Sequence, residues 1–311
     1  MSSLVLDSLA LIAAILLAAI GGEAFLRGVL GFSAWFRLPK MLVATTLAAF
    51  ATSSPELTVS SLAALAGKPE IGLGDALGSN VVNVALILGL ALMFGSLPAR
   101  LEEIRRDMIL ALAVPIITLF LISDGVLSRA DGAVLLCLFV FWLVMMARQA
   151  LHHRRRQAEE APDDQGVRFW LISLYALLGL GSLLLAGKLF VSGASGIALA
   201  MGMNPYVIGA TLVAFGTSLP ELVTTLLSRW RGHDEIGLGT VLGSNLFNGL
   251  AIVGLAASIC PIAVPLRSVI FGLGAGVLSL LLILPRKGRI SRRRGALLLA
   301  LYAAYAAASL A

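Results

Sequence analysis

The chain has 311 residues, of which 59% are hydrophobic and only 13% are charged, and its mean hydropathy is +0.97. Because about a quarter of the residues of a soluble domain are charged, this composition excludes an ordinary water-soluble globule and predicts an all-α polytopic membrane protein in a lipid bilayer. The net charge of +6 does not indicate a nucleic-acid partner, since the bases lie in short loops between apolar stretches.

Apolar stretches bounded by charged and turn residues predict ten transmembrane helices. In chain order they cover residues 4–24, 41–66, 71–95, 107–123, 130–148, 169–190, 204–228, 236–258, 267–284 and 294–310. The first stretch lacks the basic flank and cleavage site of a signal peptide, so we interpret it as a retained span.

The distribution of lysine and arginine predicts the orientation of these spans. Of the 23 bases, 19 lie in loops that follow odd-numbered spans. Because translocation of basic loops is disfavoured, these loops face the cytoplasm and both termini lie outside it. The long polar segment at 152–167 is then a cytoplasmic linker, and the simplest location is the cell (inner or plasma) membrane.

Two segments occur twice at a constant offset of 165 positions. TLAAFATSSPEL (46–57) matches TLVAFGTSLPEL (211–222), and EIGLGDALGSNVVN (70–83) matches EIGLGTVLGSNLFN (235–248). Over 46–83 and 211–248, 21 of 38 residues are identical without a gap. The pattern predicts a five-helix repeat at 1–151, the linker at 152–167 and a second repeat at 168–311.

Five crossings separate equivalent residues, so the two repeats are expected to be inverted relative to each other. Inverted repeats are typical of secondary transporters, whose ion sites lie near the membrane midplane at broken helices. Pro55 and Pro220 lie inside predicted spans, where a proline frees a backbone carbonyl that can bind a cation.

Glu56 and Glu221 follow these prolines deep inside the second and seventh spans, and we expect no comparably deep acid elsewhere. An ionised carboxylate in hydrocarbon is costly and normally marks an ion path. Neither motif contains a base, so a cation is the natural partner. Two carboxylates with hydroxyl, amide and carbonyl oxygens suit Ca²⁺ or Na⁺.

Hydroxyl and amide side chains that recur in both copies are the candidate supporting ligands. Helical spacing places the hydroxyls on the same face as the glutamate that follows them. The candidates are Thr52, Ser53, Ser79 and Asn83 in the first copy and Thr217, Ser218, Ser244 and Asn248 in the second. No nucleophile constellation and no cofactor motif accompanies them, so we expect neither an enzyme nor a bound cofactor.

The duplicated (G/A)TS(L/S)PE and GSNxxN motifs resemble those of the prokaryotic sodium/calcium exchanger family, within the calcium/cation antiporter superfamily. The resemblance implies ten transmembrane helices, with spans 1 and 6 sliding across a core so that Na⁺ is exchanged for Ca²⁺. By the same resemblance, Glu56 and Glu221 hold Ca²⁺ with the backbone carbonyls of Thr52 and Thr217. The implied flanking Na⁺ ligands are Ala49, Ser53, Ser79, Ala214, Ser218 and Ser244.

Two features depart from the family pattern. Asn248 stands where many members carry an aspartate, so the predicted site has two acids rather than three. The first motif has Ala51 and Ser54 in place of the usual glycine and leucine. Two glutamates are neutralised by one Ca²⁺, by two Na⁺ or by two H⁺, so H⁺/Ca²⁺ exchange is the main alternative. A passive cation channel and, last, an intramembrane hydrolase are further alternatives. We expect the chain to function as a monomer.

Overall fold

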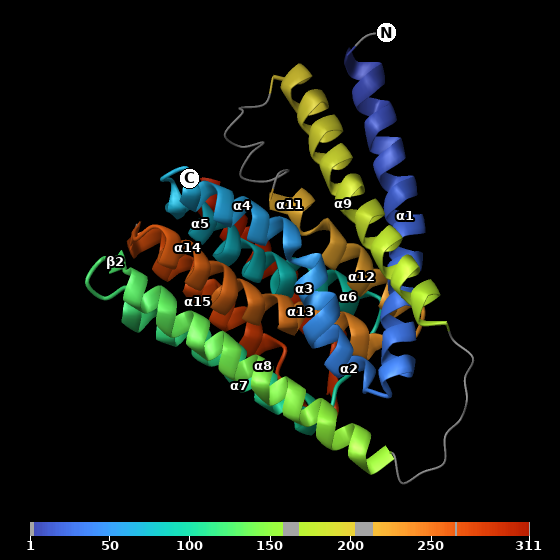
Figure 1. Cartoon of the computed structure of the whole chain (residues 1–311). Helices are drawn as coiled ribbons and strands as arrows, with labels where there is room; N and C mark the ends of the chain where they lie inside the picture. The colour runs from blue at the N-terminus through green and yellow to red at the C-terminus, as the bar shows by residue number, and fades with distance from the viewer. Residues whose placement is uncertain (1–2, 158–167, 203–213, 265, 311) are drawn as a thin grey trace.

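The computed structural model describes residues 3–157, 168–202, 214–264 and 266–310 and consists of helices with four very short strands (Figure 1). The first half of the chain contains α1 (Ser3–Phe36), α2 (Lys40–Val43), the π-helical turn η1 (Ala44–Ala48), α3 (Ala49–Thr52), α4 (Ser54–Leu65), α5 (Pro69–Val81), the π-helical turn η2 (Val82–Leu88), α6 (Gly89–Met93), β1 (Leu97–Pro98), α7 (Leu101–Leu121), β2 (Val126–Leu127) and α8 (Arg129–Gln157).

Where it is described, the second half follows the same order of elements as the first. It contains α9 (Phe169–Ala200), α11 (Ala214–Thr217), α12 (Leu219–Trp230), α13 (Asp234–Leu246), the π-helical turn η4 (Phe247–Ile252), α14 (Val253–Ile259), β3 (Ile262–Ala263), α15 (Leu266–Leu282), β4 (Arg289–Ile290) and α16 (Arg292–Leu310).

The predicted all-helical membrane fold is confirmed, and five helical stretches are long and apolar enough to cross a bilayer by themselves. Three predicted spans were too short. The helices predicted at 4–24, 130–148 and 169–190 continue to Phe36, Gln157 and Ala200, because no proline interrupts these sequences, and α8 thereby includes the first residues of the predicted linker. Part of the predicted span at 204–228, the start of the motif at 211–222 and most of the linker at 152–167 lie outside the described residues.

Apolar side chains cover the outside of the molecule, and many polar side chains lie inside it. The stretch Asp234–Ile259 (α13, η4 and α14) is buried at the centre. In contrast, α1 exposes a row of large apolar side chains, among them Leu9, Ile12 and Leu16. This arrangement suits hydrocarbon rather than water as the surrounding medium.

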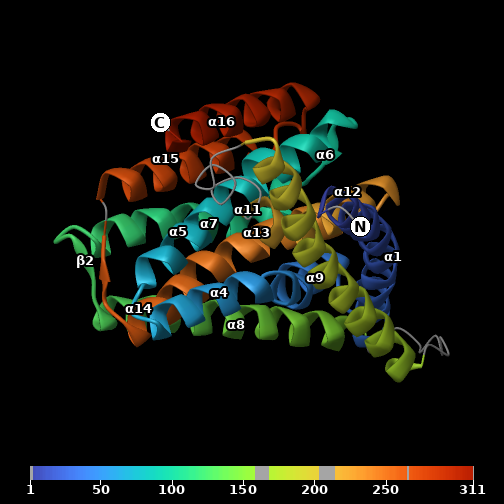
Figure 2. The same cartoon turned by 90° about the horizontal axis from the view of Figure 1, so that it is seen from above.

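Helices α1 and α9 form a long antiparallel pair along one side of the bundle (Figures 1 and 2). Small residues let their backbones approach closely. A methyl group at Gly21 would lie 2.6 Å from Cβ of Ser182, and one at Gly179 would lie 2.6 Å from Cα of Phe25. The pair therefore packs as one unit that lies beside the remaining helices.

The short strands join the two halves of the chain. Strand β1 pairs with β4, and β2 pairs with β3, both antiparallel. Leu97 in β1 and Ile262 in β3 are 165 positions apart, so equivalent strands belong to different sheets. Each sheet therefore combines one strand from each half.

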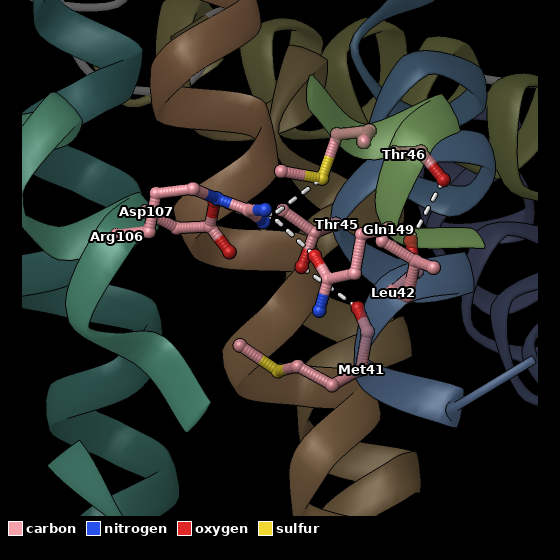
Figure 3. Close-up of polar contacts among 8 residues, drawn as sticks. Met41, Leu42, Thr45, Thr46, Arg106, Asp107 and Gln149 are labelled. Atoms are coloured by element: carbon pink, nitrogen blue, oxygen red, sulfur yellow. Dashed lines mark hydrogen bonds and ion pairs between the residues drawn. The ribbon is translucent and has the colours of Figure 1, made fainter. Parts of the chain in front are cut away.

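Polar contacts also tie α7 to α8 near the start of α2 (Figure 3). Arg106 on α7 donates hydrogen bonds to Gln149 Oε1 at 2.7 Å and to Met146 Sδ at 3.2 Å on α8. Figure 3 also shows Thr45 and Thr46, whose hydroxyls donate to backbone carbonyls four residues earlier, a contact that commonly bends a helix. Both threonines lie in η1.

Candidate cation-binding site

Both glutamates lie just after a break in a helix. The chain leaves helical geometry at Ser53 (φ −84°, ψ 11°) and in the same way at Ser218 (φ −85°, ψ 11°). Proline follows each break two residues later, where its missing N–H costs least because the first turn has unpaired N–H groups anyway. Glu56 and Glu221 thus lie in the first turns of α4 and α12, at the end of each helix dipole that favours negative charge.

Each glutamate accepts a hydrogen bond from the serine of the opposite repeat. Ser53 Oγ donates to Glu221 Oε1 at 3.1 Å, and Ser218 Oγ donates to Glu56 Oε1 at 3.5 Å. Ser244 Oγ also donates to Glu221 Oε1, at 3.3 Å. These contacts join α3, α4, α11, α12 and α13 at one point, so the two motif copies meet in space as their symmetry requires.

The two GSNxxN segments meet through asparagines that sequence reasoning missed. Asn80 Nδ2 donates to the backbone carbonyl of Asn245, and Asn245 Nδ2 donates to that of Asn80, both at 3.2 Å. The contacts hold α5 against α13 beside Ser79 and Ser244. Asn80 and Asn245 are identical at the same offset as the predicted ligands, and this signal in the sequence could have identified them.

The last asparagines of these segments are buried but differ in their contacts. Asn83 Nδ2 donates to Asn245 Oδ1 at 3.2 Å, whereas its own Oδ1 has no partner among the described residues. Asn248, which is 0% exposed, has no hydrogen-bond partner for either side-chain atom in the same part of the chain. Asn248 is four residues after Ser244, so its side chain follows the Glu221-bound serine on the same face of the helix.

The remaining predicted ligands are placed around the helix breaks. Thr52 is buried, and its hydroxyl donates to the carbonyls of Ala48 and Ala49 at 3.0 and 3.3 Å. The Ala49 carbonyl also accepts a hydrogen bond from Ser53 N at 3.0 Å. Thr217 ends α11 beside Ser218, and Ala214 begins that helix.

The site leaves carboxylate oxygens free for a ligand. Glu56 and Glu221 are 1% and 0% exposed, and Oε2 of each has no hydrogen-bond partner in the described part of the chain. Over the same residues, neither glutamate forms an ion pair with a base. No group of three or more His, Cys, Asp or Glu side chains suited to a metal occurs there either. The arrangement offers two carboxylates and neutral oxygens, which can coordinate a hard cation.

The expectation that no other acid is comparably deep was wrong. Asp107 in α7 is 3% exposed, but Arg106 contacts it at 3.1 Å. Asp75 in α5 has a buried Oδ2 without a hydrogen-bond partner among the described residues. Asp75 was not predicted, because the candidate residues were those that occur in both copies and Thr240 occupies its position in the second copy.

A cavity of about 400 Å³ lies beside the site, between α4, α9 and the α11–α12 segment. Its lining includes Pro55 and Pro220, each next to a site glutamate, together with Thr58, Gly187 and Lys188. At the equivalent place in the first repeat, a methyl group at Gly22 would lie 2.5 Å from Val223 Cγ1, and Val223 stands at the position equivalent to Thr58. This position therefore faces the cavity in one repeat and packs against α1 in the other.

Comparisons with known proteins agree with this geometry. A family model described as "Sodium/calcium exchanger protein" matches residues 7–148 and 171–311. The putative antiporter CaxA of Alkalimonas amylolytica is 33% identical over 296 residues, covering 91% of this chain and 92% of the relative. The sodium/calcium exchanger MaX1 of Methanosarcina acetivorans is 25% identical over 327 residues, covering 92% and 93%.

A solved structure has the same fold over nearly the whole chain. The sodium–calcium exchanger NCX_Mj, soaked with Na⁺ and Sr²⁺, matches with a TM-score of 0.85 at 28% identity and covers 98% of each chain. Because the match includes both halves, the likeness extends well beyond the short duplicated motifs.

Proposed function

The chain belongs to the sodium/calcium exchanger family, a family of cation antiporters, and on this premise we propose that it exchanges Na⁺ for Ca²⁺ across the membrane by alternating access. The observation that carries the proposal is the meeting of Glu56 and Glu221, each hydrogen-bonded by a serine of the opposite repeat. Their free, buried oxygens require a cation, because two unpaired carboxylates in hydrocarbon cost several kcal/mol each.

Ca²⁺ binds between the two glutamates, and Na⁺ binds at flanking positions. The Ca²⁺ ligands are the carboxylates of Glu56 and Glu221 with the backbone carbonyls of Thr52 and Thr217. The flanking Na⁺ ligands are Ser53, Ser79, Ser218 and Ser244 with the carbonyls of Ala49 and Ala214. Asn83 and Asn248 contribute neutral amide oxygens. Both ions are substrates, and no cofactor takes part.

Charge balance explains why the two ions compete. One Ca²⁺ or two Na⁺ neutralise the two glutamates, so binding of one ion removes the electrostatic reason for binding the other. The empty carrier would hold two uncompensated buried charges while it changes conformation. This state is unfavourable, and its cost couples the movement of one ion to that of the other.

The asymmetry between the repeats corresponds to one state of the transport cycle. In the proposed orientation, both termini face outward and the linker at 152–167 is cytoplasmic. The cavity beside Thr58 and Gly187 then opens from the outside, while the packing of Gly22 on Val223 closes the cytoplasmic side. An ion pair between Glu23 of α1 and Arg231 after α12, at 2.7 Å, joins the closed side.

The proposed transport cycle reverses this asymmetry. The repeats at 1–151 and 168–311 are inverted copies, and the α1–α9 pair slides so that the packed and open sides exchange. We place the protein in the cell membrane, where it works as a monomer because each chain carries both copies of the site motif.

The test is uptake of ⁴⁵Ca²⁺ into Na⁺-loaded proteoliposomes that are diluted into Na⁺-free buffer, with the pH clamped by an ionophore. Uptake that depends on internal Na⁺ is expected, and Glu56→Gln and Glu221→Gln should each abolish it. Glu70→Gln is the matched control because it removes an exposed glutamate from the first turn of α5, outside the site.

One observation favours H⁺/Ca²⁺ exchange as a second candidate: with Asn248, the predicted site has two acids rather than three. Two H⁺ would neutralise them as well as one Ca²⁺ does. Uptake that depends on a pH gradient and does not depend on internal Na⁺ would support H⁺/Ca²⁺ exchange and contradict Na⁺/Ca²⁺ exchange. Uptake without saturation or counterflow would indicate a channel and contradict both.

A further inference from the structure

Asp75 is an acid within a membrane helix that has no partner and no role in the proposed site. It lies in the middle of α5, and its Oδ2 is buried. Among the described residues it forms neither a hydrogen bond nor an ion pair, unlike Asp107, which Arg106 contacts at 3.1 Å. The residue as a whole is partly buried. An unpaired carboxylate within a membrane helix normally serves an ion or proton path.

The packing of α4 on α5 places Asp75 near Glu56. Ser60 Oγ donates to the carbonyl of Gly72 at 3.2 Å, and a methyl group at Gly72 would lie 2.8 Å from Cα of Ser60. Because the two helices are antiparallel, Glu56, one turn before Ser60, lies opposite the turn that follows Gly72 and contains Asp75.

Asp75 also shares a helix face with one predicted ligand and precedes another. Ser79 follows it by four residues on the same face of α5, and Asn83 follows in η2, the turn that continues this helix. Ser79 is buried, and Asn83 Oδ1 is buried without a partner among the described residues. These residues therefore offer a carboxylate, a hydroxyl and an amide oxygen in succession.

The second repeat lacks this acid. Thr240 is equivalent to Asp75 and is 0% exposed, with no hydrogen-bond partner for its hydroxyl in the described part of the chain. The extra carboxylate is thus present only beside Glu56.

We propose that Asp75 coordinates one Na⁺ together with Ser79, in a position beside Glu56. The proposal rests on the Na⁺/Ca²⁺ exchange proposed above. A single carboxylate balances a monovalent ion, whereas Ca²⁺ takes six to eight oxygens. With Asp75 the ion path holds three carboxylates in spite of Asn248, so three Na⁺ can balance it. Exchange of three Na⁺ for one Ca²⁺ moves one net charge.

The experiment measures Ca²⁺/Ca²⁺ exchange in proteoliposomes with increasing external Na⁺ as the competitor. The variants are Asp75→Asn and Asp75→Thr, the latter introducing the residue that the second repeat carries at the same packing position. Glu70→Gln is the matched control, because it removes an exposed charge from the same helix five residues away. The current that accompanies Na⁺/Ca²⁺ exchange is recorded in parallel.

For both Asp75 variants, we expect exchange without Na⁺ to stay within about twofold of wild type, because the Ca²⁺ ligands remain. The Na⁺ concentration for half-inhibition should rise about tenfold, since ligand charge tunes affinity. The Hill coefficient for Na⁺ should fall by about one and the current should vanish, whereas Glu70→Gln behaves as wild type.

Three results would overturn the proposal. Unchanged Na⁺ inhibition in both Asp75 variants contradicts it while leaving Na⁺/Ca²⁺ exchange intact. Equal loss of Ca²⁺/Ca²⁺ exchange and Na⁺ inhibition indicates a packing role instead. A wild-type protein that Na⁺ does not inhibit contradicts both this inference and the proposed function.

Discussion

At the scale of single residues, the site depends on contacts that cross between the repeats. Ser53 bonds Glu221, and Ser218 bonds Glu56, so neither repeat completes its own carboxylate environment. Two neutral hydroxyls do not compensate the burial of two charges. In the proposed function, a cation between the glutamates removes this deficit.

The equivalent asparagines allow a sharp prediction, because their contacts differ. Asn248→Asp breaks no hydrogen bond and adds a further negative charge one turn from Ser244, so we expect about tenfold tighter Ca²⁺ binding. Asn83→Asp removes the donor to Asn245 Oδ1 and sets two acceptors against each other, which should cost about 1–3 kcal/mol of stability.

Both variants can be compared by Ca²⁺ affinity and by thermal unfolding in detergent. Weaker Ca²⁺ binding by Asn248→Asp would contradict the proposed place of Asn248 beside the Ca²⁺ site. An unchanged unfolding temperature of Asn83→Asp would contradict a stabilising role for the hydrogen bond from Asn83 to Asn245.

The duplicated residues were predictable from the sequence because both copies display them. Asn80 and Asn245 were equally visible but resembled packing residues, and only the structure shows that they bond each other across the repeats. Asp75 has no acidic counterpart, so the comparison that revealed Glu56 and Glu221 passed over it. The hydrogen bonds that Thr52 and Ser53 donate to the Ala49 carbonyl could not be predicted, because residue spacing does not reveal hydrogen-bond geometry.

At the scale of elements, the helices that are broken at the site and the unbroken helices α1 and α9 have different structural roles. The breaks at Ser53 and Ser218 present the glutamates at helix N-termini, and the prolines make these breaks predictable. The unbroken α1 and α9 pack as a pair through small residues. The predicted spans for these two helices were too short. Glycines along both helices allow close packing between them.

This close packing predicts a contrast between two glycines of α9. Gly179→Val would place a side chain against the backbone of Phe25, so it should separate the pair, lower the unfolding temperature and reduce the rate of exchange. Gly181→Val is the matched control, because no atom of the described residues lies within 4 Å of a methyl group there. Equal behaviour of the two variants in unfolding and transport assays would show that the α1–α9 contact has no such role.

At the scale of the whole molecule, near-identical motifs produce unequal surroundings. Thr58 and Val223 are equivalent positions, yet Thr58 lines the cavity beside α9, whereas Val223 packs against Gly22 of α1. Sequence comparison predicts the symmetry but not which side is open, because the two states share the same residues. The side that is packed in a given state follows from the position of the α1–α9 pair.

The asymmetry predicts the accessibility of these two positions from outside. In a background with Cys137 and Cys260 replaced by alanine, Thr58→Cys should react with a membrane-impermeant thiol reagent in right-side-out vesicles. Val223→Cys should not react from that side. Labelling of Val223→Cys from outside, or protection of Thr58→Cys, would contradict the proposed orientation and state.

The central claim is that one Ca²⁺ binds between the two repeats and takes one carboxylate from each. Isothermal titration calorimetry of the purified protein in Na⁺-free buffer tests it directly. The account predicts about one Ca²⁺ per chain, displaced by Na⁺, with binding lost in Glu56→Gln and also in Glu221→Gln, because each glutamate supplies half of the charge that balances the ion. Two Ca²⁺ per chain, or one Ca²⁺ retained in each single variant, would show that the glutamates belong to separate sites.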